Sequence, residues 1–477
     1  MFPHKLIRFC LSIIWPLILF TNVPKLEAAP ANLSLKKGDR ITLVGAGMGS
    51  RMIHYGHLET ELYLRFPLKD LTLRNLCDEG NTPGFRPHPG RGQGGQYAFP
   101  GAQELISQKL KAGSGPNGHF ETSDQWLTRL KTDVIIAFFG FNSSFDGVGE
   151  LSRFKKELDA FLKHTLAQKY NGKSAPRLVL VSPTAVQAIK GVTDGVQQNT
   201  NLILYTEAMR AVARENNVLF VDAFSPSNQW YSDGKAHTVD GALLNGLGYR
   251  KLASLLVDSL FQEENPSGNL RSAVHKAVMD KNFYWQNDFK VPNGVHVYGR
   301  RYNPFGPKNY PFELKKTREM TEIRDQAIWA TLKGKAFDVK AADAKTSKLP
   351  AVQSNYRPGG KNGNVNYNPG EVTQTKIQVA EGYKIELFAD EGRFPDLATP
   401  VQMAFDNKGR LWVATMASYP HYRIGDPHPK DKLIIFEDTN NDGKADKQIN
   451  FADDLHIPIG FEISHDGVYV SQSGGLV

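Results

Sequence analysis

Cysteine is scarce in this sequence: there are two in 477 residues, Cys10 and Cys77. Cys10 lies in an N-terminal segment that we expect to be removed, which leaves Cys77 without a partner in the chain. This excludes an intrachain disulfide. The sequence also has no Cys-x-x-Cys-His motif, so a covalently attached c-type haem is not expected.

Long apolar runs are missing as well. The run at residues 11–20 is shorter than the ~20 residues that a membrane-spanning helix needs. Lys5 and Arg8 precede it and an alanine-rich stretch at 27–31 follows, which is the pattern of a secretory signal. We therefore predict a signal peptide at residues 1–29 and a secreted or periplasmic mature protein with no stable membrane span after processing. An uncleaved N-terminal anchor is the alternative.

The sequence also lacks concentrated charge. It has 57 lysines and arginines against 49 aspartates and glutamates, but the basic residues are spread along the chain without a tract or interleaved aromatic side chains. A nucleic-acid site needs such a concentration of positive charge. We therefore expect no nucleic-acid partner.

The sequence does contain an alternation of short β-rich runs with longer helical ones over residues 32–262. The predicted strands are residues 40–44, 71–75, 133–139, 177–181 and 218–222. The run at 133–139 is apolar throughout, as in a strand buried on both faces. This order predicts an α/β domain of three layers, with a parallel sheet between two layers of helices.

Two further regions follow this domain. Residues 263–375 combine helical pieces at 270–287 and 313–332 with Pro/Gly/Asn-rich stretches, and we interpret them as a mixed linker region. In residues 376–477 the apolar residues alternate, and 402–414 loosely resemble 461–471. A repeated pair of strands with an Asp/Gly turn predicts β-propeller blades. Because a whole propeller needs about four to eight blades, we expect a partial, all-β propeller here.

Four blocks within residues 32–262 resemble those of the SGNH (GDSL-type) hydrolases. Residues 38–45 are similar to the first strand of that family, 75–82 to its second block, Gly140-Phe-Asn142 to its G-x-N block, and 240–249 to its last block, D-G-x-H-L-N-x-x-G-Y. The resemblance implies a flavodoxin-like three-layer fold and an ester hydrolase. In such enzymes a serine attacks the carbonyl, a histidine oriented by an aspartate takes its proton, and backbone N–H groups and an asparagine hold the oxyanion.

Two residues of that machinery are absent. The resemblance places Gly47 at the serine position and Leu243 at the histidine position, while Asp240 keeps the aspartate position. The oxyanion positions are kept by Gly80, Gly140 and Asn142. Glycine offers no nucleophile and leucine carries no proton, and such losses cost on the order of 10⁴ or more in rate. We expect a catalytically impaired domain that binds a small-molecule, glycan or ester-type ligand.

A relocated catalytic pair is the rival hypothesis. Ser50 lies three residues beyond the serine position and His237 six residues before the histidine position. Together with Asp240 they would make an active ester or carbohydrate-ester hydrolase. The ordinary alternatives are a helix N-cap for Ser50 and a solvated loop residue for His237.

Residues 438–446 carry a motif similar to the first part of a calcium loop, with a glycine at its sixth position. Its candidate ligands are Asp438, Asn440, Asp442 and Asp446. The usual glutamate at position 12 is replaced by Ile449. We predict calcium as a cofactor, and a simple Asp/Asn/Gly hairpin turn is the alternative.

Residues 399–420 resemble the start of PVC-type membrane-bound dehydrogenase propellers, relatives of the sorbosone and quinoprotein glucose dehydrogenases. The resemblance implies a third hypothesis, in which this chain is the N-terminal scaffold of a larger redox protein. Since most blades that would line a quinone site are missing, we expect no dehydrogenase activity of the chain itself.

Overall fold

The computed structural model describes residues 32–87, 92, 94–113, 120–262, 269–292, 294–299, 301–354, 368–419, 422, 426–473 and 475–477. The predicted signal peptide lies outside these ranges. None of the helices in the described ranges combines the length and the apolar character that crossing a bilayer requires.

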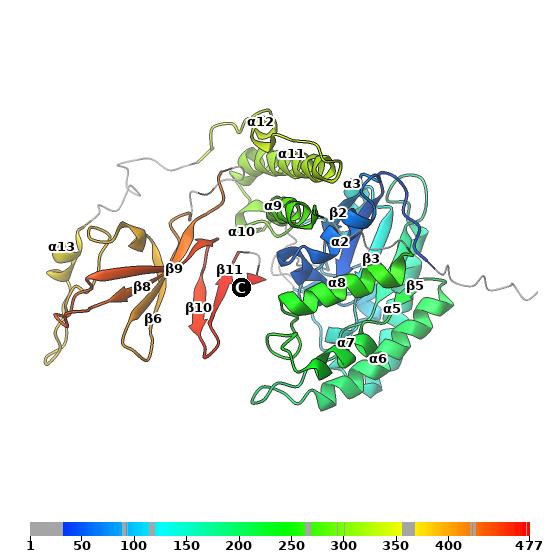
Figure 1. Ribbon diagram of the computed structural model, residues 1–477, viewed down its shortest axis with the longest axis horizontal. Helices are drawn as coiled ribbons and strands as arrows, with labels where there is room; N and C mark the ends of the chain where they lie inside the picture. The colour runs from blue at the N-terminus through cyan, green and yellow to red at the C-terminus, as the bar shows by residue number, and fades with distance from the viewer. Residues whose placement is uncertain are drawn as a thin grey trace, which may run out of the picture.

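A five-stranded parallel sheet forms the centre of the N-terminal part of the chain (Figure 1). Its strands are β1 (Arg40–Gly45), β2 (Thr72–Asn75), β3 (Val134–Phe138), β4 (Arg177–Val181) and β5 (Leu219–Val221). Their order is β2-β1-β3-β4-β5, and all neighbours are parallel. The predicted parallel sheet is therefore confirmed. The winding direction reverses between β1 and β3, and ligands of open α/β sheets bind at the carboxyl ends of the strands at such a point.

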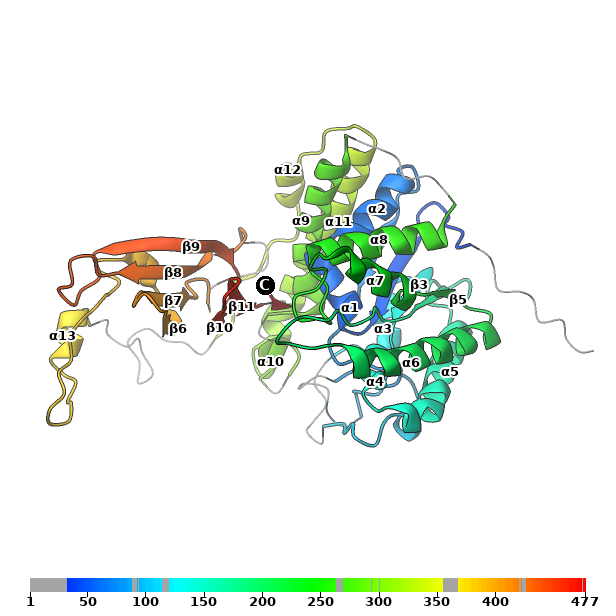
Figure 2. The ribbon, with the colours of Figure 1, turned by 60° about the horizontal axis from the view of Figure 1, so that its bottom comes forward.

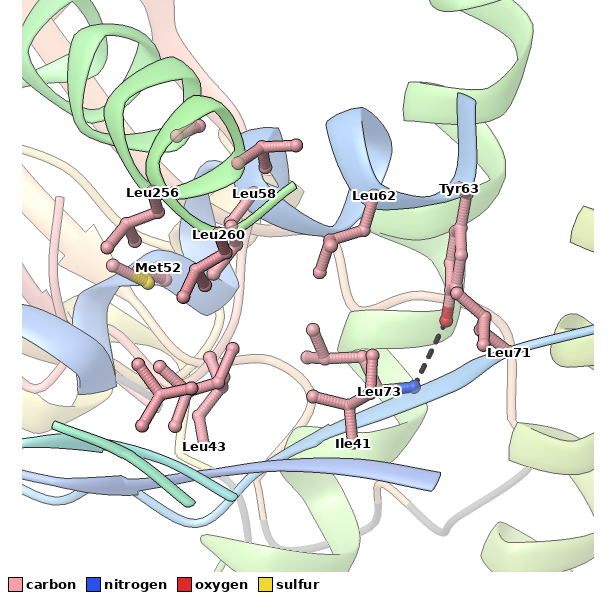
Figure 3. Close-up of a cluster of buried hydrophobic side chains, with 14 of the residues drawn as sticks. Ile41, Leu43, Met52, Leu58, Leu62, Tyr63, Leu71, Leu73, Leu256 and Leu260 are labelled. Atoms are coloured by element: carbon pink, nitrogen blue, oxygen red, sulfur yellow. Dashed lines mark hydrogen bonds between the residues drawn. The ribbon is translucent and has the colours of Figure 1, made fainter. Parts of the chain in front are cut away.

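Helices cover both faces of this sheet. On one face lie α2 (His57–Arg65) and α8 (Gly246–Leu260), whose leucines point toward Ile41, Leu43 and Leu73 of the strands (Figure 3). The Tyr63 hydroxyl accepts a hydrogen bond from the Leu73 amide at 3.1 Å and so fixes α2 against β2. The other face is covered by α3 (Ser123–Leu130), α5 (Leu151–Ala167) and α6 (Val196–Glu215). The three predicted layers are present.

Two long helices beyond residue 262 cover the edge of this sheet at β2. They are α9 (Arg271–Phe289) and α11 (Gly306–Leu332), which lie side by side (Figures 1 and 2). Three side chains from these helices donate hydrogen bonds to backbone carbonyls along β2 and the residue before it: Trp329 to Leu71, Lys281 to Leu73 and Trp285 to Asn75, at 2.8, 3.2 and 2.9 Å. An unpaired sheet edge invites association with other chains, and these donors occupy it.

Buried ion pairs hold the two helices in place. Lys281 Nζ lies 2.8 Å from Glu59 Oε2 of α2, and the Arg74 guanidinium of β2 forms a two-pronged contact with Asp325 of α11. Both pairs are nearly excluded from solvent. The helical pieces expected at 270–287 and 313–332 are present as α9 and α11, and both helices pack on the α/β domain. The bounds of the mixed linker region, 263–375, stay a prediction.

The remaining helices are short. They are α1 (Gly47–Ser50), α4 (Phe141–Ser144), α7 (Phe224–Trp230), α10 (Gly294–Val297), α12 (Val339–Asp343) and α13 (Gly370–Gln374).

Two antiparallel sheets make up the C-terminal part. The first contains β6 (Pro400–Phe405), β7 (Leu411–Thr415), β8 (Asp431–Glu437) and β9 (Lys447–Leu455), and the second β10 (Gly460–Ile463), β11 (Val468–Gln472) and β12 (Gly475–Leu476). Trp412 and Leu433 of the first sheet share a core with Phe461 and Val470 of the second. The antiparallel strands are present as expected, and their completion into a propeller stays a prediction.

The C-terminal sheets also contact α9. The ring of His428, just before β8, stacks on Phe283 with 3.9 Å between ring centroids. In both ribbon views β10 and β11 lie between the four-stranded sheet and the helical part of the chain (Figures 1 and 2).

Candidate ligand-binding site

The loops after β1 and β3 approach each other closely at the carboxyl end of the sheet. Gly45 has φ +127°, and a Cβ there would lie 2.1 Å from the carbonyl oxygen of Phe138, so no other residue fits without a backbone shift. Gly140 has φ +101°, and a Cβ there would lie 2.6 Å from Met209 Sδ. These two glycines let α1, with Gly47, and α4, with Asn142, start directly at the sheet edge.

A chain of side-chain amides connects the ends of three strands. Asn142 Nδ2 donates to the carbonyl of Asn81 at 3.0 Å, and Asn81 Nδ2 donates to the carbonyl of Gly45 at 3.0 Å. A primary amide has two N–H donors, so one donor of Asn142 is committed and the second remains for a ligand. The side-chain amide of Asn142, which the resemblance assigned to an oxyanion site, is thus held in one orientation.

A pocket of about 170 Å³ lies at this point. The sequence-predicted positions Gly47, Gly80, Asn142 and Leu243 all line it. The rest of its wall is mostly apolar and includes Met48, Phe138, Phe139, Phe141, Pro183, Leu244 and Tyr249. These four positions of the resemblance therefore lie around one cavity, with glycine and leucine at the positions of the nucleophile and the base, while Gly140 and Asp240 are not part of its lining.

Asp240 lies beside this pocket in the loop before α8. Its Oδ1 accepts hydrogen bonds from the backbone amides of Ala242 and Leu243, at 2.9 and 2.7 Å. In the SGNH arrangement an aspartate orients a histidine three residues later, and here it orders the backbone of a leucine instead. The carboxylate is in place, and the group that it would orient is missing.

Ser50 and His237, the relocated pair, have separate partners. Ser50 Oγ donates to Glu79 Oε1 at 2.8 Å and accepts from Lys290 Nζ at 2.9 Å. His237 Nε2 lies 2.9 Å from Asp233 Oδ1. The two ordinary alternatives, a helix N-cap for Ser50 and a solvated loop residue for His237, are not found either. The Ser50 side chain caps no helix, and the His237 side chain is fully buried.

Lys290, at the end of α9, joins two acidic residues at the rim of the pocket. Its Nζ lies 2.8 Å from Glu79 Oε2 and 3.1 Å from Asp78 Oδ1. Burial disfavours the charge on Lys290, but Asp78 and Glu79 outweigh it and raise the Lys290 pKa. Burial likewise opposes the charge on Glu79, and the Lys290 ammonium with its hydrogen bond prevails and lowers the Glu79 pKa to about 2.

This electrostatic arrangement disfavours Ser50 as a nucleophile. A general base has to accept the serine proton near neutral pH. The two carboxylates raise the Lys290 pKa and the Lys290 ammonium lowers the Glu79 pKa, and the lowered Glu79 pKa makes that carboxylate a weak proton acceptor. A relocated nucleophile at Ser50 stays a hypothesis. Sequence reasoning missed Lys290 because it lies outside the four SGNH-like blocks, in a region without a motif.

Cys77 supports packing rather than chemistry. Its side chain is buried, and burial raises the pKa of its thiol well above the ordinary value. A Cβ at Gly49 would lie 2.5 Å from Cys77 Sγ, so the two residues fit closely beneath α1. A thiol with a raised pKa is a poor nucleophile.

The predicted calcium loop forms an ordered turn between β8 and β9. Asp438 Oδ2 accepts from the Gly443 amide at 2.8 Å, and Asp446 accepts from the hydroxyl of Thr439 at 2.9 Å. Within the described part of the chain no three His, Cys, Asp or Glu side chains are gathered as metal ligands. Calcium at Asp438, Asn440, Asp442 and Asp446 stays a prediction.

One known family matches the C-terminal part of the chain. The family described as "Domain of unknown function (DUF7133)" matches residues 369–477, the region of the two antiparallel sheets. No curated protein matches the sequence.

Solved structures with similarity to this chain include several esterases. A catalytic mutant of Axe2, an acetylxylan esterase from Geobacillus stearothermophilus, has 13% identity and a TM-score of 0.34, covering 50% of this chain and 100% of that one. A protein described as a GDSL-like lipase, from Parabacteroides merdae, has 13% identity and a TM-score of 0.34, with 48% and 98% covered. BT4096, a gut microbial diltiazem-metabolizing enzyme, has 16% identity and a TM-score of 0.34.

The match to BT4096 spans 49% of this chain and about half, 49%, of that enzyme.

Proposed function

We propose that the α/β domain binds a small ester-type ligand, such as an O-acylated sugar, at the carboxyl end of its sheet without hydrolysing it. The observation that carries this proposal is the shared pocket of Gly47, Asn142 and Leu243. The amide that would stabilise an oxyanion is present, and the groups that would attack and transfer a proton are replaced by hydrogen and an apolar side chain.

The chemistry of the pocket favours a short acyl group. Its volume of about 170 Å³ is below the roughly 300–1,000 Å³ of pockets that hold drug-sized ligands. Phenylalanine, methionine and leucine side chains accept an alkyl end, and the Asn142 amide offers a donor to a carbonyl oxygen. The Lys290 ammonium at the rim is already paired with Asp78 and Glu79, so it does not attract an anionic ligand, and this favours a neutral one.

Ligand-observed NMR on the mature protein with phenyl acetate tests this proposal. We expect binding without consumption of the ester. Leu243→Trp would fill the cavity and abolish binding, and Asn142→Ala would weaken binding by several-fold, the effect of one hydrogen bond. Leu68→Ala, which alters an exposed side chain, is the matched control.

Two results would overturn the proposal. One is a wild-type protein that consumes the ester at an enzymatic rate. The other is binding that persists unchanged in a correctly folded Leu243→Trp protein.

Export of the mature chain and calcium binding at residues 438–446 are further proposals that rest on the sequence. A role as scaffold in a larger propeller protein is also a proposal. It rests on the sequence and draws support from the antiparallel sheets at residues 400–476.

A further inference from the structure

A second cleft lies at the opposite, amino end of the sheet. Its volume is about 410 Å³, within the roughly 300–1,000 Å³ of typical ligand pockets. One wall is formed by Arg40 and Thr72, at the starts of β1 and β2, and by the last turn of α3. The other wall is α9 and α11, the helices that cover the sheet edge. This cleft is therefore separate from the pocket around Gly47.

The buried charges beneath the cleft neutralise one another. Arg74 is paired with Asp325. Arg318 Nε lies 2.9 Å from Asp288 Oδ2, and Arg129 Nη1 lies 3.5 Å from the same oxygen. The Arg129 guanidinium also pairs with Glu121. These pairs fix the floor and leave no strong net charge to attract an ionic ligand.

The indole rings contribute rigid apolar surface. Trp285 and Trp329 both line the cleft, and each donates its indole N–H to a backbone carbonyl of β2 or of the residue before it, so both rings are held in place. Trp285 is almost fully buried, and Trp329 is half-buried and forms the accessible part of this wall. A ligand with an apolar face gains contact there.

Three exposed polar side chains at the rim complete the site. Among the described residues, the Arg40 side chain has one hydrogen bond, a long one of 3.4 Å from Nη1 to the carbonyl of Leu130. Glu322 and Gln326, one turn apart on α11, are exposed and line the same cleft. A guanidinium offers a planar fork of donors, a carboxylate offers acceptors and an amide offers both. This mixture suits adjacent hydroxyl groups, each of which donates and accepts.

We propose that this cleft binds an uncharged saccharide, with a sugar ring against Trp329 and its hydroxyl groups on Arg40, Glu322 and Gln326. The balanced charges of the floor disfavour an anionic ligand, and the fixed indole wall suits the C–H face of a pyranose ring. The site is independent of the proposed ester pocket.

Isothermal titration calorimetry of the mature protein with cellotetraose, xylotetraose and mannotetraose tests this proposal. We expect at least one of these neutral oligosaccharides to bind. Arg40→Ala and Gln326→Ala should each weaken its affinity about tenfold, the effect of losing hydrogen bonds to exposed polar groups at a ligand. The affinity should not change between low and high salt, because the ligand carries no charge.

Controls separate this site from the ester pocket. Arg214→Ala, an exposed arginine on α6, should leave the affinity unchanged, and so should Leu243→Trp. The proposal is overturned if none of the three oligosaccharides binds, or if only an acidic oligosaccharide such as trigalacturonate binds. It is also overturned if binding survives Arg40→Ala and Gln326→Ala but is lost in Leu243→Trp.

Discussion

Lys290 Nζ lies 2.8 Å from Glu79 Oε2, and this contact joins the end of α9 to the rim of the pocket around Gly47. The pocket is built from loops of the α/β sheet, but its electrostatics depend on a helix from the region after residue 262. Two acidic residues, Asp78 and Glu79, share the single ammonium group. The helices beyond the SGNH-like blocks are therefore part of the site as well as of the fold.

Replacing Lys290 by methionine should destabilise the protein and alter the pocket. The substitution leaves Asp78, which is 18% exposed, and Glu79, which is 58% exposed, without their cation. We expect a loss of about 1 kcal/mol in the free energy of unfolding, the lower end of the cost of unpaired polar groups, because solvent screens Glu79. The pKa of Glu79 should rise from about 2. Urea denaturation at neutral pH measures the first effect, with Lys290→Arg as the charge-preserving control. Equal stability of the methionine variant and the wild type would contradict the account.

Removing Asp325, the partner of Arg74, should lower the free energy of unfolding more than replacing Lys290 by methionine does. Asp325→Ala leaves a buried guanidinium without its carboxylate, and breaking a buried ion pair costs about 3–5 kcal/mol. Glu207→Ala is the matched control because Glu207 is 62% exposed and its partner Arg210 is 45% exposed, and such pairs contribute about 0–1 kcal/mol. Urea denaturation of both variants makes the comparison. Similar losses in the two would show that α11 is not an integral part of the domain.

Stability should fall in mild acid because of His57. Burial, with the nearby His275, Arg250 and Arg271, lowers the His57 pKa to about 4. The unfolded chain, with a histidine pKa near 6.5, then binds more protons than the folded one between about pH 6.5 and 4. The free energy of unfolding should therefore decrease as the pH falls through this window.

Comparing wild type with His57→Gln at pH 7 and pH 5 isolates this contribution, because the other titrating groups are shared. The variant should lose less stability than the wild type on going to pH 5. A loss of the same size in both proteins would show that His57 titrates normally in the folded state.

Much of the α/β domain was predictable because its strands carry a strong local signal. β3 is apolar at every position and buried throughout, and the glycines at the strand ends mark where the backbone must turn. The relative order of the SGNH-like blocks then placed Gly47, Asn142 and Leu243 around one pocket. These are properties of short segments, which a sequence displays directly.

The packing of α9 and α11 was not predictable in the same way. Their buried faces contain Lys281, Asp288 and Asp325, so the apolar stripe that marks a packed helix is interrupted. Each of these charges is satisfied by a residue far away in the sequence, such as Glu59 or Arg74. His237 escaped prediction for a similar reason, since its polar loop conceals a fully buried side chain.

We propose that Gly47 and Leu243 remove catalysis from a site that keeps Asn142 and Asp240. The most direct test of this central claim is to measure hydrolysis of p-nitrophenyl acetate by the wild type, by Gly47→Ser/Leu243→His and by Ser50→Ala. A Cβ at Gly47 has no neighbour closer than Glu79 Cγ at 3.9 Å, so a serine fits there. We predict no turnover by the wild type or Ser50→Ala, and a gain on the order of 10² or more in the double variant, since Asp240 and Asn142 are present. Wild-type turnover that disappears in Ser50→Ala would contradict the account.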